Sequence, residues 1–160
     1  MSADPILEFQ KLFDEAKTRE RADATACALA TAAPNAAPSV RIVLLKGVDA
    51  EGFTFFTNYT SRKASELDMN PQAALCFFWP EMGVQVRVEG HTSRVSAEES
   101  SAYFATRPRE SQLGAWASRQ STLLDSRETL LARLRDMEQK FAGHSVPCPE
   151  HWGGFGSGPP

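Results

Sequence analysis

Two pairs of basic residues in the first half of the chain have a spacing that suits phosphate binding. Arg41 and Lys46 stand at the two ends of the apolar run IVLL, and Arg62-Lys63 follow Ser61. In a regular strand, Arg41 and Lys46 would face opposite sides, with their Cα atoms about 16 Å apart. One phosphate cannot easily engage both cations, so the spacing predicts two anions, or one anion and a structural salt bridge. The alternative is that both cations only extend toward water from the ends of a buried strand.

The second pair lies where a helix is predicted to begin, directly after Ser61. Free backbone N–H groups, the helix dipole, a hydroxyl and two cations all favour a phosphate at such a position. Arg62 offers a planar fork of donors, whereas Lys63 offers a mobile point charge. The alternative interpretation is a solvated helix start, because basic pairs are common.

A third polar group lies in the segment YFATRPRES. Tyr103 and Arg107 are four residues apart and share one face of a predicted helix, and Arg109 and Ser111 follow them. A phenol, a guanidinium and a hydroxyl that converge on one point would form a second phosphate site. The alternative is a helix C-terminus whose cations complement the helix dipole.

No motif marks a strong nucleophile or a metal site. The sequence contains no Walker A loop and no GxSxG motif. Its three cysteines and three histidines lack the spacing of metal ligands. The scattered cysteines predict reduced thiols in a cytoplasmic protein. If the chain is an enzyme, we expect a bound cofactor to carry the chemistry.

The composition is that of a globular protein of one domain. The 160 residues are 42% hydrophobic and 23% charged, with a formal net charge of -3. This charge gives no general case for binding nucleic acid or a membrane surface, so an anion site must be built locally. The N-terminus lacks a basic segment followed by an apolar run, and no apolar run approaches the ~20 residues of a membrane helix.

Helices and strands are expected to position these residues. Capping residues such as Asp4 and Ser96 mark helix starts, and alternation of valine with polar residues from Val84 marks a strand. The predicted helices are 3–16, 62–70, 97–107 and 125–141, and the predicted strands are 25–33, 40–47, 53–58, 73–79 and 84–95. Residues 111–121 are predicted to be irregular or briefly helical, and the Gly- and Pro-rich residues 151–160 are predicted not to continue a regular element. The layout predicts a small antiparallel barrel with helices packed around it.

Several segments together resemble the pyridoxamine 5′-phosphate oxidase family, in the order RIVLLKG, FTFFTNYTSRKASEL, NPQAALCFFW, QVRVEG, YFATRPRESQLGAWASRQS and HWGGF. The resemblance extends from about Asp4 to Phe155. It implies an α+β fold, the antiparallel FMN-binding split β-barrel with peripheral helices, with 1–155 as one domain and 156–160 as a Gly/Pro-rich tail. It also implies a homodimer with FMN at the interface. Such an enzyme oxidises pyridoxamine or pyridoxine 5′-phosphate to pyridoxal 5′-phosphate, with O₂ as the acceptor.

The resemblance also implies roles for particular residues, and no metal. The residues expected at FMN are Arg41, Ile42, Val43, Leu44, Leu45, Lys46, Phe56, Thr57, Arg62, Lys63, Gln85, Gln120 and Ser121. Of these, Arg41, Arg62 and Lys63 are expected largely at the FMN phosphate. Gln85 is expected to hydrogen-bond the isoalloxazine. The residues expected to clamp the substrate phosphate are Lys46, Tyr103, Arg107 and Ser111.

The chain departs from the family pattern at both ends. Family members continue beyond WGGF with further flavin contacts and with the Arg and His nearest the reacting carbon, whereas this chain stops at GSGPP. The basic N-terminal arm of many members is also missing. No catalytic residue is therefore assigned, and activity is expected to be impaired. A non-catalytic protein that binds FMN or pyridoxal 5′-phosphate stays open, as does a split-barrel flavin oxidase with another substrate, as in phenazine pathways. The RPRESQ segment argues against the latter.

Overall fold

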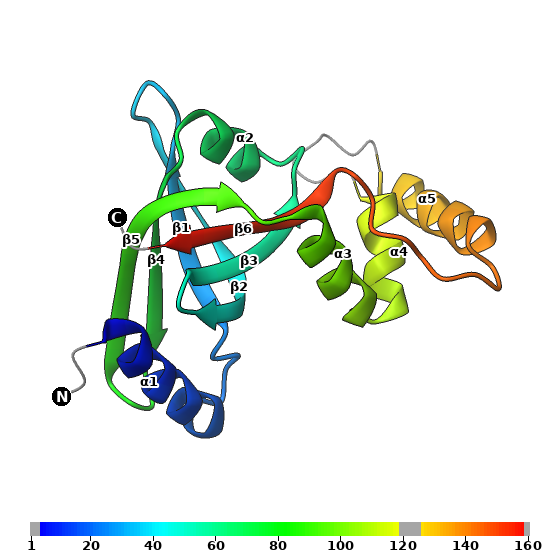
Figure 1. Cartoon of the computed structure of the whole chain (residues 1–160). Helices are drawn as coiled ribbons and strands as arrows, with labels where there is room; N and C mark the ends of the chain where they lie inside the picture. The colour runs from blue at the N-terminus through cyan, green and yellow to red at the C-terminus, as the bar shows by residue number, and fades with distance from the viewer. Residues whose placement is uncertain (1–3, 119–125, 159–160) are drawn as a thin grey trace. The chain divides into compact units, whose positions relative to one another are not determined.

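The described part of the chain forms six strands and five helices, in the order α1, β1, β2, β3, α2, β4, β5, α3, α4, α5 and β6 (Figure 1). The computed structural model describes residues 4–118 and 126–158. These residues fall into two compact units, one made of 4–55, 66–93 and 155–158 and the other of 56–65, 94–118 and 126–154. The single domain predicted for 1–155 stays a prediction.

The six strands form a closed antiparallel barrel in the order β1-β2-β3-β6-β5-β4, which confirms the predicted barrel. Their bounds are Ala26–Ala32 for β1, Pro38–Asp49 for β2, Gly52–Asn58 for β3, Gln72–Trp79 for β4, Val84–Arg94 for β5 and Trp152–Gly158 for β6. Side chains alternate between the core and the outside, as the period of a strand requires. Leu29, Leu45, Leu75 and Phe77 are among the residues that fill the core, each at most 3% exposed.

Strand β2 carries a local irregularity at the second of its two cations. The pairing of β2 with β3 shifts register between Leu45 and Gly47, so a β-bulge lies at Lys46. From Pro38 to Leu45 the side chains of β2 alternate regularly between exposed and more buried positions, and Arg41 is half-buried on the core side. Lys46, at the bulge, is exposed. The predicted placement of the two cations on opposite faces agrees with this pattern.

The expectation that residues 151–160 form no regular element is wrong, because Trp152–Gly158 is strand β6. The predicted tail at 156–160 thus begins inside this strand. Barrel closure supplies backbone partners that local sequence signals do not reveal. Glycines in the neighbouring strands permit the close approach: a Cβ on Gly52 would lie 2.0 Å from the Ser157 carbonyl oxygen, and one on Gly90 would lie 2.2 Å from that of Gly158.

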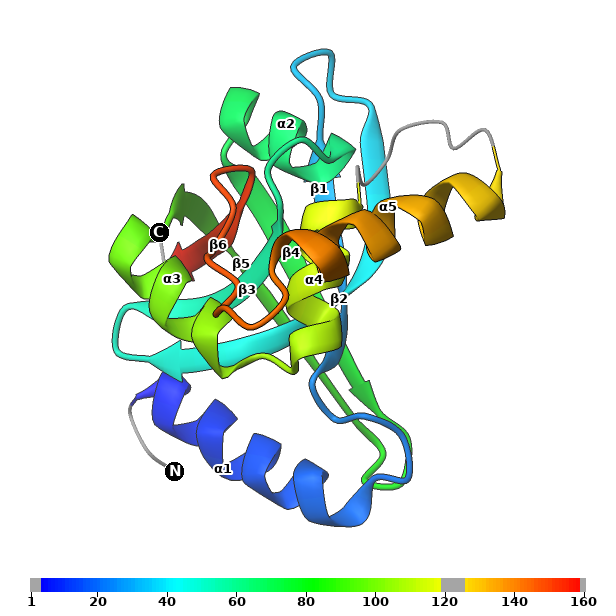
Figure 2. The ribbon, with the colours of Figure 1, turned by 90° about the vertical axis from the view of Figure 1, so that its right-hand side faces the viewer.

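Helix α1, Pro5–Arg19, lies across one end of the barrel (Figures 1 and 2). The Asp4 carboxylate accepts a hydrogen bond from the Ile6 N–H at 2.9 Å, which confirms the predicted cap. Phe9 inserts its ring against the barrel core, with centroids 4.8 Å from Phe53 and 5.1 Å from Phe77. The helix therefore closes the apolar interior at this end.

Three helices belong to the second unit: α3 at Ala97–Thr106, α4 at Arg109–Ala117 and α5 at Arg127–Lys140. Ser96 caps α3 as predicted, since its Oγ accepts from the Glu99 N–H at 3.0 Å. The segment predicted to be irregular or briefly helical contains most of α4, a regular helix that begins directly after Pro108. The cap of α5 is Ser126, whereas the predicted opening residue, Asp125, lies outside the described residues.

These helices share a core with the start of β6, made of Phe104, Leu113, Phe141, Val146 and Trp152. Figure 2 shows α4 and α5 side by side. Helix α2, Arg62–Met69, follows β3 after a short turn, close to the predicted bounds. No helix in residues 4–118 and 126–158 is long and apolar enough to cross a membrane.

Candidate functional site

The N-terminus of α2 carries two predicted FMN ligands, Arg62 and Lys63, and brings Lys63 to a third, Thr57. Lys63 is 9% exposed, and its Nζ donates a hydrogen bond to the Thr57 hydroxyl at 3.1 Å. Ser61 is fully buried, and its Oγ accepts from the Ala64 N–H at 3.4 Å. Arg62 is exposed at the first position of the helix. A hydroxyl, a buried ammonium and a helix N-terminus thus adjoin, which is the arrangement that favours a phosphate.

Arg41 lies within a polar network on the core side of β1 and β2. Its Nη1 donates to the Leu29 carbonyl at 3.1 Å and to the Thr31 hydroxyl at 2.6 Å. Its Nη2 donates to the Ser39 hydroxyl at 2.5 Å and lies 3.3 Å from Oε2 of Glu66. The structural salt bridge that the spacing of Arg41 and Lys46 allowed is therefore present at Arg41. No local signal in the sequence identified Glu66 as its partner.

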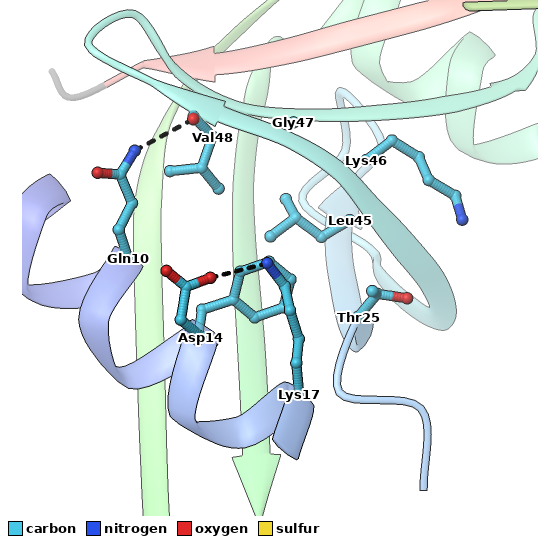
Figure 3. Close-up of a pocket in the computed structure, with 9 residues that line it drawn as sticks. Gln10, Asp14, Lys17, Thr25, Leu45, Lys46, Gly47 and Val48 are labelled. Carbon is cyan, nitrogen blue, oxygen red and sulfur yellow. Dashed lines mark hydrogen bonds and ion pairs between the residues drawn. The ribbon is translucent and has the colours of Figure 1, made fainter. Parts of the chain in front are cut away.

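Lys46 lines a pocket of about 480 Å³ between α1 and β2. Figure 3 shows the Lys46 side chain directed away from α1, on the side of Thr25, and the Lys17 ammonium bonded to Asp14. The other lining residues are Gln10, Phe13, Leu45, Gly47 and Val48. The residues of α1 in this pocket were not predicted, because their spacing is that of an ordinary amphipathic helix. Lys46 also helps to lower the pKa of Asp23, after the larger effect of hydrogen bonds from Thr25.

In the second unit, three aromatic rings lie nearly parallel. Phe56 stacks on Tyr103 with centroids 4.1 Å apart and on Trp152 with centroids 5.3 Å apart, at interplanar angles of 13° and 8°. Phe56 was predicted to line the flavin, and its stacking on the predicted clamp residue Tyr103 was not foreseen. Glycine makes this packing possible: a Cβ on Gly154 would lie 2.9 Å from the Phe56 ring and 2.7 Å from Cγ2 of Val95.

Arg107 ends α3 as its C-cap, beside this stack. Its guanidinium carbon lies 4.8 Å from the centroid of the Trp152 ring and 5.7 Å from that of Phe104. Its Nη1 is buried without a hydrogen-bond partner among the described residues. Burial lowers the pKa of Arg107, and Tyr103 and Cys148 act in the opposite direction. A guanidinium keeps its charge under ordinary conditions, so this is a half-buried cation with a buried, unpartnered Nη1 that could receive an anion.

The remaining predicted site residues are spread over several elements. Ser111 lies in the first turn of α4, and in the described part of the structure it makes no hydrogen bond to Tyr103 or Arg107. Gln85 lies on the exposed face of β5, paired in register with Phe78 of β4. Residues 42–45 alternate in β2, with Ile42 and Leu44 exposed, Val43 half-buried and Leu45 in the core. Gln120 and Ser121 lie outside the described residues.

These residues can bind anions and flat rings. Cations with nearby hydroxyls occur around Arg41 and Lys63, and a cation beside a ring stack occurs at Arg107. Among residues 4–118 and 126–158, no group of His, Cys, Asp or Glu could hold a metal ion. The buried ammonium of Lys63, bonded to the Thr57 hydroxyl at the N-terminus of α2, fits the phosphate end of a flavin mononucleotide.

Comparison with known proteins identifies close relatives. Residues 13–141 match the family described as Pyridoxamine 5'-phosphate oxidase. A protein of Rubrobacter xylanophilus named Pyridoxine/pyridoxamine 5'-phosphate oxidase is 55% identical over 152 residues, covering 95% of this chain and 70% of that protein. A protein of the same name from Anaeromyxobacter dehalogenans is 53% identical over 152 residues, covering 95% of this chain and 77% of its own length.

Solved structures share the fold. PhzG from Burkholderia lata, in complex with tetrahydrophenazine-1-carboxylic acid, has a TM-score of 0.93 and 27% identity, covering 99% of this chain and 77% of that chain. A pyridoxamine 5'-phosphate oxidase-related, FMN binding protein from Nostoc punctiforme has a TM-score of 0.76 and 19% identity, covering 99% and 83%. The second likeness concerns the fold alone, and it confirms the predicted split barrel. Sequence and fold together show that the chain belongs to the pyridoxamine 5′-phosphate oxidase family, a family of flavin-binding oxidases.

Proposed function

We propose that this protein oxidises pyridoxamine or pyridoxine 5′-phosphate to pyridoxal 5′-phosphate, with FMN as cofactor and O₂ as electron acceptor. The names of relatives about half identical to it support this substrate class. The observation that carries the proposal is the buried, unpartnered Nη1 of Arg107, in the described part of the chain, beside Tyr103 and Trp152. An orphaned buried donor costs free energy, and a substrate phosphate would satisfy it.

The residues proposed to hold FMN supply cations and hydroxyls for its phosphate. In the second unit these are Thr57, Ser61, Arg62 and Lys63, of which Lys63 is already buried and oriented by Thr57. In the first unit, Arg41 is held by hydroxyls and by Glu66. The chemistry that FMN supplies when bound is acceptance of a hydride from the substrate and transfer of its electrons to O₂. We propose the remaining predicted contacts, at 42–46, Phe56, Gln85, Gln120 and Ser121, as further parts of this site.

The chain itself would bind and orient the substrate. Arg107, the C-cap of α3, gives a planar fork of donors for a phosphate, and Tyr103 in the last turn of that helix would add a hydroxyl. Stacking on Phe56 restricts the ring of Tyr103 to one plane, so the phenol is presented in a fixed direction. We propose Lys46 and Ser111 as the other members of this clamp.

We also propose a homodimer that uses the outer face of β2, β1 and β4. Val40, Ile42 and Phe78 on this face are 68%, 67% and 64% exposed. The residues between them in register are small or apolar: Ala28, Ala30, Ala74 and Cys76. This face, called here the β2–β4 face, is a contiguous apolar surface of the kind that marks a protein interface. The edge of the β2–β4 face reaches Gln85, the residue proposed at the flavin ring. Because the flavin is proposed to lie between two copies of the chain, we propose a second copy as the partner that covers this face.

An anaerobic reduction assay tests the proposed reaction. FMN-loaded protein is mixed with pyridoxamine 5′-phosphate, and the visible flavin absorbance is followed. We expect the flavin absorbance to bleach and then to return when O₂ is admitted. We also expect pyridoxal 5′-phosphate to form. Pyridoxamine without phosphate is the matched control and should bleach the flavin far more slowly, since Arg107 would have no anion to bind. Bound flavin that stays oxidised with the phosphorylated substrate would contradict the proposal and leave a non-catalytic binding role.

A flavin oxidase with a carboxylate-bearing tricyclic substrate is the second candidate. The TM-score of 0.93 to PhzG in complex with tetrahydrophenazine-1-carboxylic acid favours it. Both candidates need a cation for an anionic group, so Arg107 does not discriminate between them. The same assay does: bleaching by tetrahydrophenazine-1-carboxylic acid and not by pyridoxamine 5′-phosphate would select this alternative.

A further inference from the structure

Glu66 is a buried acidic residue at the centre of a polar network in the first unit. The residue is 4% exposed, and its Oε2 accepts hydrogen bonds from the hydroxyls of Thr31 and Ser39, each at 2.5 Å. The same oxygen lies 3.3 Å from Nη2 of Arg41. A buried carboxylate is tolerated only where charge and hydrogen bonds surround it, and three donors meet this one.

The donors and acceptors of this network form a consistent set. Each hydroxyl has one proton and donates it to Glu66, so its lone pairs are available to Arg41. Thr31 accepts from Nη1 of Arg41 at 2.6 Å, and Ser39 accepts from Nη2 at 2.5 Å. The carboxylate therefore sets the direction of both hydroxyls, and the two hydroxyls set the plane of the guanidinium.

We propose that Glu66 is a positioning residue for recognition of the flavin phosphate, acting through Arg41. The inference rests on the proposed function, in which Arg41 is a ligand of that phosphate. A guanidinium binds phosphate well only when its flat fork is held in register with the phosphate oxygens. Without Glu66, the two hydroxyls would lose their common acceptor, and Arg41 would be free to leave the plane in which they hold it.

The test compares FMN with riboflavin, which differ only in the phosphate. Glu66→Gln keeps the shape of the side chain and removes its charge. We expect FMN affinity about tenfold weaker, the value of losing one charge-assisted hydrogen bond, and riboflavin affinity unchanged. Fluorescence-quenching titrations give both constants. Asp68→Asn is the matched control, because it makes the same charge change at an exposed position of the same helix and should alter neither.

A thermodynamic cycle shows whether the effect passes through Arg41. In an Arg41→Met background, Glu66→Gln should cause no further loss of FMN affinity, since the residue that it positions is gone. Ser39→Ala is a second variant that leaves no buried charge unpaired, and it should weaken FMN about three- to tenfold while sparing riboflavin. The Ser39→Ala variant provides the same test if the Glu66→Gln variant does not fold.

Each outcome bears on the proposal. Tighter FMN binding by Glu66→Gln would overturn it, because Glu66 would then act only as a negative charge opposing the phosphate. Equal losses for FMN and riboflavin, or an unchanged FMN affinity, would also overturn it. Failure of the proposed function looks different: the wild-type chain itself would then show no preference for FMN over riboflavin.

Discussion

Replacing Arg107 with methionine removes a cation whose Nη1 is buried and unpartnered in the described part of the structure. Methionine keeps most of the length and apolar volume of the side chain, so packing against Trp152 is largely retained. If Arg107 exists to bind a substrate phosphate, the change should damage ligand binding and leave the unliganded protein almost as stable as before.

The magnitudes follow from the contacts of Arg107. An unsatisfied buried donor costs about 1–3 kcal/mol, and the guanidinium over the Trp152 ring, 4.8 Å away, returns about 0.5–2 kcal/mol. These contributions nearly cancel, so the free energy of unfolding without ligand should change by less than about 1 kcal/mol. A lost charge-assisted hydrogen bond to phosphate costs about 1.5–3 kcal/mol, which corresponds to roughly 10- to 150-fold weaker binding.

Thermal unfolding with and without pyridoxal 5′-phosphate measures both quantities. At a ligand concentration of 100 times Kd, the wild-type chain should gain about 2.7 kcal/mol, or roughly 5–10 °C in Tm for a chain of this size. A variant that binds 100-fold more weakly would gain only about 0.4 kcal/mol at the same concentration. The Tm shift caused by the ligand should therefore almost disappear.

Arg109 provides a matched control two residues away. Its Nη1 donates to the His144 carbonyl at 2.9 Å, and its Nη2 donates to the Phe141 carbonyl at 2.7 Å, so its hydrogen bonds are structural. Arg109→Met should lower stability by about 1–2 kcal/mol and preserve the ligand-induced shift. The reasoning is refuted if Arg107→Met lowers the stability of the unliganded protein by several kcal/mol while the ligand-induced shift survives, or if the two variants lose that shift equally.

Four further predictions follow from particular contacts. Lys63→Met should weaken FMN more than tenfold and leave riboflavin unaffected in a quenching titration, since its buried ammonium is proposed at the phosphate; equal losses would contradict this. Gly154→Ala should lower the free energy of unfolding by about 1–3 kcal/mol, because the added Cβ would enter occupied space. Gly114→Ala, in a helix with open space around it, should raise the free energy of unfolding by about 0.5–1 kcal/mol. Urea unfolding measures both changes. Ile42→Glu should convert the proposed dimer to a monomer in sedimentation velocity, and a dimer that this substitution leaves unchanged would contradict an interface on the β2–β4 face. Burial raises the pKa of Cys27 to about 12, so native protein should resist alkylation at this thiol at pH 8.5, whereas urea-unfolded protein should react. Above pH 9 the unfolded chain loses a proton that the native chain keeps. The free energy of unfolding contributed by this thiol therefore falls as pH rises.

Much of the fold could be predicted because its signals are local. Asp4 and Ser96 accept hydrogen bonds from N–H groups two or three residues ahead, so the sequence alone determines where α1 and α3 begin. The alternation in Val84–Arg94 likewise determines which side chains of β5 face inward. The family could also be identified from its ordered motifs, and with it the candidate residues at Lys63 and Arg107.

The tertiary structure alone decided the partners of these residues, because each partner lies far away in the sequence. Glu66 reaches Arg41 across 25 positions, which no helix or strand periodicity links. The ring of Phe56 meets those of Tyr103 and Trp152 only where β3, α3 and β6 come together. The Gly- and Pro-rich composition of the end of the chain likewise predicted irregular structure, yet these residues form strand β6. Closure of the barrel supplies long-range backbone hydrogen bonds that outweigh a weak strand propensity.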